Sequence, residues 1–189
     1  MNEPLFLFVG KSSSGKTTIA NILEQKHGFK QVNSYTTRPQ RYDGEIGHMF
    51  VTENEFKSLG DMIAYTFYNG NHYGTTQEQL DQCSIYVVDI PGVEALLQKY
   101  HSDRPIVIIY FDTNVFTRIN RMIDRGDSDV MIVSRLLQDE KSDWFYQLDS
   151  IVWKYTHILG RDVKLHFMNS NGDLTSVLTM VKYYMGVVV

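Results

Sequence analysis

Apolar residues follow two patterns along the chain: short unbroken runs and longer stretches with helical spacing. Three runs, at residues 5–9, 85–88 and 106–111, are rich in β-branched and aromatic residues and show no polar alternation. Such runs are typical of strands that are buried on both faces of a parallel sheet. A weaker run at residues 163–168 predicts one more strand.

Between and after these runs, apolar residues recur at intervals of three or four, which indicates amphipathic helices. The stripes consist of Ile19, Ile22 and Leu23; Val115, Ile119, Met122 and Ile123; Val133, Leu136 and Leu137; and Leu174, Leu178, Val181 and Met185. Strands that alternate with helices predict a three-layer α/β fold with right-handed crossovers.

Residues 33–75 interrupt this alternation. They are rich in Thr, Tyr, Gly and Asn, and they contain turn signals at residues 42–44 and 69–71. Short strands are expected on either side of the second turn, at residues 62–68 and at Tyr73. We therefore predict a single domain with a core formed by residues 1–32 and 76–189. The insert, residues 33–75, would stand over the carboxyl edge of the sheet, where α/β proteins bind ligands.

Composition narrows the classes of function. The 189 residues suggest one domain, and 18 basic against 22 acidic side chains give a net charge of −4. This charge argues against a protein that binds nucleic acid through bulk positive charge. The single cysteine, Cys83, excludes an internal disulfide framework and a multi-cysteine metal site. With neither a signal peptide nor an apolar segment long enough to span a bilayer, we expect a soluble, cytoplasmic monomer or homodimer without a membrane partner.

The segment from Gly10 to Thr17, GKSSSGKT, matches the phosphate-loop pattern G-x-x-x-x-G-K-[ST] between the first predicted strand and the first helix. Glycines let the backbone N–H groups converge on a phosphate, at the positive end of the helix dipole. Lys16 can serve the β- and γ-phosphates, and the Thr17 hydroxyl can bind Mg²⁺. The pattern predicts a nucleoside triphosphate site formed by Gly10, Ser12, Ser13, Ser14, Gly15, Lys16, Thr17 and Thr18.

A phosphate loop alone leaves motor, GTPase and kinase functions open. A GTPase would need an N-K-x-D base-reading motif, which is absent from the sequence. The D-x-x-G spacing occurs at residues 89–92, but so short a pattern carries little weight alone.

Further motifs favour one kinase family. Ser34, Thr36, Thr37, Arg38, Arg41, Gly44-Glu45 and Phe50-Val51 are similar to the pattern S-x-T-T-R-x-x-R, G-E and aromatic-F-V of the guanylate kinase family. Residues 70–75, GNHYGT, resemble the family's G-N-x-Y-G-[ST], and Asp89 matches its strand-end Asp. Residues 121–126 with Arg135-Leu136 resemble its lid, R-L-x-x-R-G followed by R-L. The resemblance runs from Leu5 to about Leu174.

The resemblance implies a P-loop NTPase fold with a small mixed monophosphate-binding insert and a helical lid at approximately 121–135. It also implies transfer of the γ-phosphoryl group of ATP to GMP or dGMP, with Mg²⁺. The family's roles fall on Lys16, Arg121, Arg125 and Arg135 for catalysis, Asn169 for adenine, Thr17 and Asp89 for Mg²⁺, and Ser34, Arg38, Arg41, His48, Tyr73, Thr75 and Asp89 for the acceptor.

Simple physical arguments bear on several of these residues. Arg38 and Arg41 can make bidentate bonds to a monophosphate, and Tyr73 can add a phenolic donor. Arginines at positions 118, 121 and 125 share one helix face, and we expect Arg118 to lie at the surface. Asp89 can instead simply cap the turn into the next helix.

Two positions depart from the family pattern. The family's guanine-reading Glu falls on Ala64, which cannot accept a hydrogen bond, so that Asp89, Asp61, Thr66 or a water would have to replace it. His48 stands where the family has a phosphate-binding Tyr, and either phosphate binding or a structural role is open to it.

Two alternatives to a guanylate kinase therefore stay open. One is a kinase of the same fold that acts on another nucleotide or a sugar phosphate, which Ala64 favours. The other is a non-catalytic guanylate kinase-like scaffold that binds partner proteins. Scaffolds of that type typically have degraded phosphate loops, whereas Lys16 and Thr17 are both present here.

Overall fold

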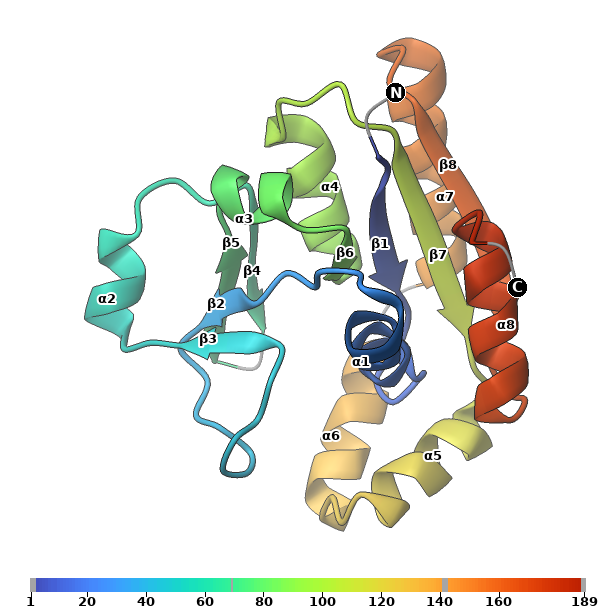
Figure 1. Cartoon of the computed structure of the whole chain (residues 1–189). Coiled ribbons are helices and arrows are strands. Elements are labelled where there is room, and N and C mark those ends of the chain that lie inside the picture. Colours follow the sequence, from blue (N-terminus) through green and yellow to red (C-terminus); the bar gives the residue numbers. More distant parts are fainter. Residues whose placement is uncertain (1–2, 69, 141–142, 188–189) are drawn as a thin grey trace.

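The protein contains two four-stranded sheets (Figure 1). The computed structural model describes residues 3–68, 70–140 and 143–187. The first sheet is parallel throughout, in the order β6 (Ile85–Val87), β1 (Leu5–Val9), β7 (Ile106–Asp112) and β8 (Val163–Asn169). The predicted parallel sheet is confirmed. Strands β7 and β8 extend one residue further than predicted, and β6 ends one residue earlier.

Helices cover both faces of this sheet, because alternate side chains of its strands point to opposite sides. On one face, Phe6 and Phe8 pack with helices α1 (Lys16–His27) and α8 (Leu174–Tyr184). On the other, Leu5 and Leu7 pack with α4 (Ile90–Lys99), α7 (Trp144–Trp153) and the short π-helix η1 (Lys154–Ile158). Burial on both faces explains the unbroken apolar runs of the sequence.

The second sheet lies to one side of the first (Figure 1). Its strands follow the order β3 (His48–Phe50), β2 (Ser34–Thr36), β5 (Asn71–Thr75) and β4 (Ala64–Tyr68), with β2 and β3 parallel and the other pairs antiparallel. Its connections include helix α2 (Glu53–Ser58), and α3 (Gln77–Gln82) leads back to the first sheet. Ala64 packs in the same cluster as α4, so the two sheets share apolar contacts.

Helices α5 (Val115–Asp124) and α6 (Asp129–Asp139) lie beyond the carboxyl ends of β1 and β7 (Figure 1). The expectation that Arg118 is at the surface is wrong: its side chain is 1% exposed. The inward face of α5 carries Arg118 and Met122, while Phe116 and Ile123 face solvent. Arg118 is tolerated inside because Asp139 of α6 neutralises it at 2.7 Å.

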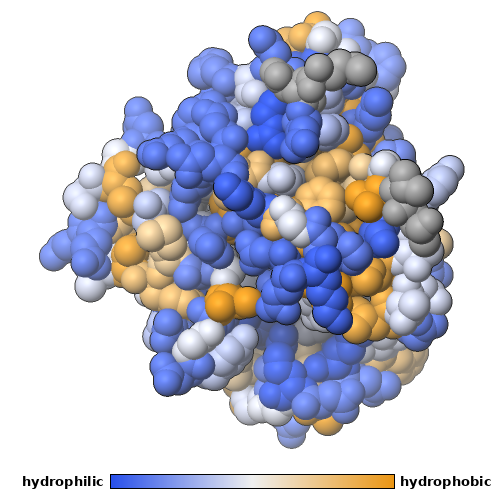
Figure 2. Space-filling view, in the orientation of Figure 1, coloured by the Kyte–Doolittle hydropathy of each residue, from blue (hydrophilic) through white to orange (hydrophobic). Residues whose placement is uncertain are grey.

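The surface in the view of Figure 2 is mostly hydrophilic, with apolar side chains gathered over the second sheet and beside α8. Among the residues that the structure describes, no helix is long and apolar enough to cross a bilayer.

The side chain of Arg104 links several backbone segments at the amino-terminal edge of the parallel sheet. The guanidinium of Arg104 donates hydrogen bonds to the backbone carbonyls of Glu3, Pro4, Leu80 and Cys83, at 2.8 to 3.1 Å. It thus links the start of β1 to α3 and to the segment before β6.

Replacing this side chain tests the link. Arg104→Met should lower the free energy of unfolding by about 2 kcal/mol, because four carbonyl groups lose a charged donor. Urea denaturation measures the change, with Lys57→Met as the control, since the Lys57 ammonium is exposed and only reaches Glu53 at 3.9 Å. Equal denaturation midpoints for the two variants would contradict the assignment.

Candidate active site

The phosphate loop is a tight turn from the end of β1 to the start of α1. Gly10 has φ +154°, and a Cβ there would lie 2.7 Å from the backbone oxygen of Phe111 in β7, so the position requires glycine. Gly15, with φ +98°, is the N-cap of α1. Because glycine has no side chain that could cap the helix, the first N–H groups of α1 are left for a ligand.

The ammonium of Lys16 folds back over its own loop. It donates to the carbonyls of Gly10 and Lys11 at 2.6 and 2.9 Å, and to the Ser14 hydroxyl at 3.2 Å. Burial lowers the pKa of Lys16 to about 8, although the charge of Asp139 opposes this. The loop therefore holds a desolvated cation that an anionic ligand would stabilise.

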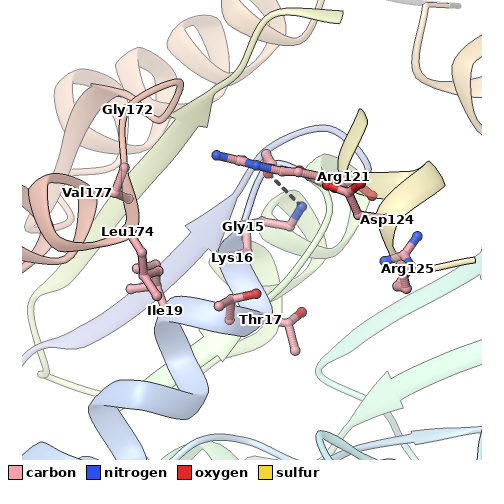
Figure 3. Close-up of a pocket in the computed structure, with 13 residues that line it drawn as sticks. Gly15, Lys16, Thr17, Ile19, Arg121, Asp124, Arg125, Gly172, Leu174 and Val177 are labelled. Carbon is pink, nitrogen blue, oxygen red and sulfur yellow. Dashed lines mark hydrogen bonds between the residues drawn. The ribbon is translucent and has the colours of Figure 1, made fainter. Parts of the chain in front are cut away.

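A cavity of about 560 Å³, here called the loop cavity, opens at the start of α1 (Figure 3). Arg121 lies across the loop, where its guanidinium donates to the carbonyls of Ser13 and Ser170 at 3.3 and 2.8 Å. The lining residues are Ser13, Ser14, Gly15, Lys16, Thr17, Thr18, Ile19, Arg121, Asp124, Arg125, Gly172, Leu174 and Val177.

A second cavity of about 210 Å³, here called the inter-sheet cavity, lies between the phosphate loop and the second sheet. Lys16 lines this cavity as well as the loop cavity. The other polar residues that line it are Ser12, Ser34, Arg41, His48, Thr66, Tyr68, Tyr73, Tyr86, Asp89, Arg135 and Asp139.

A nearly buried carboxylate organises the basic residues that follow β2. Glu45 forms a bidentate pair with Arg38, at 2.8 and 3.1 Å, and accepts from the Arg41 amide at 2.8 Å. Burial opposes ionisation, but the hydrogen bonds from Arg38 and Arg41 lower the pKa of Glu45 overall. Arg41 lines the inter-sheet cavity. Arg38 is not among the lining residues, and its guanidinium lies over the ring of Phe50.

Two separate groups of polar contacts lie at the wall of the inter-sheet cavity. Ser34 Oγ lies 2.9 Å from His48 Nδ1. Asp89 Oδ1 accepts from Thr66 Oγ1 and from the Gly92 amide, both at 2.9 Å. Burial raises the pKa of Asp89, while these two hydrogen bonds oppose the rise. Asp89 thus caps α4 and also lines the cavity, and its role toward a ligand stays a prediction.

Two lid arginines share one acidic partner. Arg125 forms a bidentate pair with Asp127, and Arg135 Nε lies 3.5 Å from the same carboxylate. Hydrogen bonds from Arg125 lower the pKa of Asp127, although burial opposes them. Both guanidiniums are therefore held by a carboxylate of the lid itself.

Comparison with known proteins identifies the family. The sequence matches the family model described as guanylate kinase over residues 2–143. A curated guanylate kinase of Lactococcus lactis subsp. lactis is 33% identical over 144 residues, 70% of each chain. The chain belongs to the guanylate kinase family. A guanylate kinase of Streptococcus mutans is 30% identical over 151 residues, 74% of this chain and 71% of that one.

A solved guanylate kinase supports the fold. The crystal structure of the enzyme from Anaplasma phagocytophilum matches with a TM-score of 0.51 at 16% identity, covering 97% of this chain and 85% of that chain. At this identity the match bears on the fold alone.

The guanylate kinase residues predicted from the sequence divide between the two cavities. Ser13, Ser14, Gly15, Thr17, Thr18, Arg121 and Arg125 line the loop cavity. Gly10, Ser12, Ser34, Arg41, His48, Tyr73, Asp89 and Arg135 line the inter-sheet cavity. Thr75 is buried beside it, where its hydroxyl donates to Gln79 Oε1 at 2.8 Å.

Asn169, the residue predicted to contact adenine, lies apart from both cavities. Its Oδ1 accepts from the backbone and side-chain nitrogens of Asn171, at 2.9 and 2.8 Å. It lines a separate cavity together with Lys11, Glu140 and Phe145. The loop after β8 instead presents Gly172 and, from α8, Leu174 and Val177 to the loop cavity.

Sequence reasoning missed Tyr68 and Asp139 among the lining residues and named Thr66 only as a possible replacement acceptor. The positions 64, 66 and 68 of β4 share one face, so a strand that places Ala64 at the cavity also places Thr66 and Tyr68 there. Asp139 gave no motif signal. Its spacing of four residues from Arg135 on one helix is the only feature that could have indicated it.

His48 predicts a pH dependence of stability. Burial lowers the pKa of His48 to about 4, and the charge of Arg38 adds to the shift. Between pH 6.5 and 4 an unfolded histidine binds a proton that the folded one does not, so stability falls as the pH falls.

The variant His48→Gln removes this contribution. Its free energy of unfolding should fall less than that of the wild type between pH 6.5 and 4, by about 1–2 kcal/mol. Urea denaturation at pH 4, 5, 6.5 and 7.5 measures the difference. Parallel curves for the two proteins over this range would show that His48 is not buried as a neutral ring.

Proposed function

We propose that this chain is a guanylate kinase that transfers the γ-phosphoryl group of ATP to GMP or dGMP, giving ADP and GDP or dGDP. The observation that carries the proposal is the position of Lys16, which lines both cavities. A triphosphate in the loop cavity and a monophosphate in the inter-sheet cavity would meet at this ammonium group. The names of the curated relatives point to the same reaction.

Catalysis would rest on position and charge, without a covalent intermediate. Lys16 would exchange the carbonyls of Gly10 and Lys11 for oxygens of the β- and γ-phosphates, which restores its full charge. Arg38 and Arg41, held by Glu45, would bind the acceptor phosphate, with Tyr73 and His48 as further donors.

The lid would complete the positive surroundings of the transferred group. Arg121 already lies across the phosphate loop, where its described partners are the backbone carbonyls of Ser13 and Ser170, so a phosphate oxygen is a stronger partner for it. Arg125 and Arg135 would have to leave Asp127, and the Arg125 side chain is 40% exposed, where ion pairs are weak. Arg125 can therefore turn toward a nucleotide at a lower cost than Arg135, whose side chain is 18% exposed.

Thr17 and Asp89 are the residues that would hold Mg²⁺. Both offer hard oxygen atoms, and Mg²⁺ usually takes only one or two protein ligands besides phosphates and waters. In the part of the chain that the structure describes, no three His, Cys, Asp or Glu side chains cluster as metal ligands, which suits a metal brought in with the triphosphate. The ion would supply neutralisation of the phosphate oxygens. An enzyme with these substrates would act in the cytoplasm.

Ala64 favours a second candidate, a kinase of the same fold for another phosphate acceptor. A small apolar residue stands where the family reads guanine with a carboxylate, in a wall that also contains Thr66 and Asp89. If those two residues do not replace the missing acceptor, the N1–H and 2-amino groups of guanine would stay unpaired. A site that pairs all the polar groups of its substrate can prefer that substrate by a factor of about 10⁴, so a site without the partner can lose up to this preference.

The test of the reaction is ADP formation from ATP and Mg²⁺ with GMP, dGMP, AMP, CMP, UMP, dTMP and ribose phosphates. GMP or dGMP should give the highest kcat/KM. Lys16→Met should lower kcat at least about 100-fold, because the transferred phosphoryl group loses its nearest cation. Lys26→Met, at the exposed end of α1, is the control. Turnover with another acceptor alone would favour the second candidate, and no turnover with any acceptor would contradict both kinases.

A substitution at position 64 tests how the base is read. Ala64→Glu should raise kcat/KM for GMP relative to AMP at least about tenfold, because it returns a carboxylate to the wall of the inter-sheet cavity. Ala64→Gln has the same size without the charge and is the matched control. An unchanged GMP-to-AMP ratio in Ala64→Glu would show that the base does not bind against β4.

A further inference from the structure

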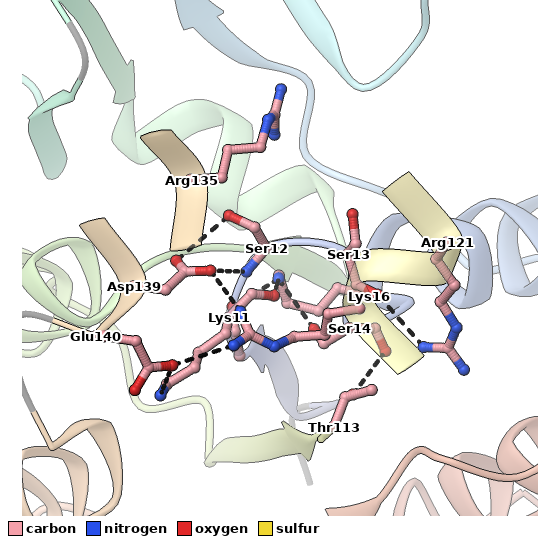
Figure 4. Close-up of polar contacts among 12 residues, drawn as sticks. Lys11, Ser12, Ser13, Ser14, Lys16, Thr113, Arg121, Arg135, Asp139 and Glu140 are labelled. Atoms are coloured by element: carbon pink, nitrogen blue, oxygen red, sulfur yellow. Dashed lines mark hydrogen bonds and ion pairs between the residues drawn. The ribbon is translucent and has the colours of Figure 1, made fainter. Parts of the chain in front are cut away.

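A carboxylate at the end of α6 binds the phosphate loop directly. Asp139, the last residue of α6, is 3% exposed, and its Oδ2 accepts from the Ser12 amide at 2.9 Å. Its Oδ1 lies 3.3 Å from the Ser12 hydroxyl, which donates to it. Figure 4 shows these contacts at the centre of a network that joins the loop to α6. A carboxylate of the protein thus accepts a hydrogen bond from a backbone N–H group of the phosphate loop.

Arg118 extends the network to α5. Its guanidinium donates to Asp139 Oδ2 at 2.7 Å and to Glu140 Oε1 at 3.1 Å. Lys11 donates to the same Glu140 oxygen at 2.9 Å. Two consecutive loop residues, Lys11 and Ser12, are therefore bonded to two consecutive residues at the end of α6.

Stability alone does not account for a buried pair of this kind. Removing two charges from water is expensive, and apolar side chains of similar volume usually pack in their place at no loss. What apolar side chains cannot provide is an acceptor for the Ser12 amide at a fixed position. The network therefore fixes the position of the carboxylate at the end of α6 relative to the Ser12 amide, which apolar packing would not do.

The geometry matters because of Arg135. This residue precedes Asp139 by four positions, one turn of helix, so both lie on the same side of α6 (Figure 4). Arg135, Asp139, Ser12 and Lys16 all line the inter-sheet cavity. Because Asp139 is held at the phosphate loop, the backbone of Arg135, about one helical turn earlier in α6, is also fixed relative to Lys16.

We propose that Asp139 is a positioning residue for phosphoryl transfer, which fixes α6 to the phosphate loop through Ser12 and Arg118 and thereby aims Arg135 at the phosphate that meets Lys16. Arg118 balances the carboxylate, so the pair adds no net negative charge beside the phosphates. Tyr68 of β4 lines the inter-sheet cavity together with Ser12, which brings the second sheet to the same junction. The inference rests on the phosphoryl transfer proposed above.

Five variants separate positioning from folding. Asp139→Ala removes the acceptor, and Asp129→Asn changes an exposed carboxylate at the other end of α6, which lies outside the inter-sheet cavity. The double variant Arg118→Met with Asp139→Leu replaces the ion pair by apolar side chains and should recover the melting temperature that Asp139→Ala loses. Arg135→Ala, alone and combined with Asp139→Ala, closes a double-mutant cycle.

The expected result is a split between kcat and KM. Asp139→Ala should lower kcat about 10- to 100-fold and leave KM for ATP within about threefold, since a misplaced group costs rate rather than binding. The apolar double variant should melt like the wild type and keep the low kcat. In the Arg135→Ala background, Asp139→Ala should lower kcat less than about threefold further. The control Asp129→Asn should stay within about threefold of the wild type.

Recovery of kcat in the apolar double variant, or losses that multiply in the cycle, would overturn the proposal. Amide hydrogen exchange provides a readout that does not depend on the acceptor. In the apolar double variant, residues 10–16 and 129–139 should both lose protection against exchange, while α4 keeps it. Unchanged protection would overturn the positioning role even if the wild type phosphorylates GMP. Lost protection would support the Ser12 anchor even if GMP proves not to be the acceptor.

Discussion

The site depends on the close passage of the phosphate loop across the end of β7. Gly10 lies so near the Phe111 carbonyl that any side chain would displace the loop, and this passage turns the chain into α1 with its first amides exposed to a ligand. Lys16 is fixed by the same turn, since its ammonium is held by carbonyls of the loop itself. The distance between loop and sheet edge thus determines where both the amides and the cation stand.

Around this turn, arginine side chains form ion pairs with nearby carboxylates. Glu45 holds Arg38 and Arg41, Asp127 holds Arg125 and Arg135, and Asp139 holds Arg118. A carboxylate resembles a phosphate in charge and in its two acceptor oxygens, so each of these carboxylates holds its guanidinium as an oxyanion would. The pairs differ in burial. The Arg38–Glu45 and Arg118–Asp139 pairs are enclosed and act as fixed framework, whereas Arg41 and Arg125 are 37% and 40% exposed and can leave their carboxylates more easily.

The parts of the fold that are local in sequence could be predicted. The phosphate loop needs eight consecutive residues between a strand and a helix, and a sheet buried on both faces leaves unbroken apolar runs. The order of the second sheet could not be predicted, because β2 and β3 pair in parallel across a connection whose path is set by tertiary contacts. Arg118 shows another limit. Periodicity states which residues share a helix face, but the inward face of α5 is chosen by Asp139, which lies 21 residues away.

The cavity wall around Ala64 shows how far a missing motif residue changes the chemistry. Ala64 and Thr66 point to the same side of β4, so the loss of a carboxylate at one position is accompanied by a hydroxyl two residues later. That hydroxyl donates to Asp89 Oδ1, and the Gly92 amide donates to the same oxygen, so the carboxylate cannot rotate freely. A fixed carboxylate discriminates between bases better than a mobile one, because its hydrogen bonds to the correct base need no reorganisation. In the proposed reaction, recognition of guanine would then fall to Asp89, two residues beyond the end of β6, rather than to β4.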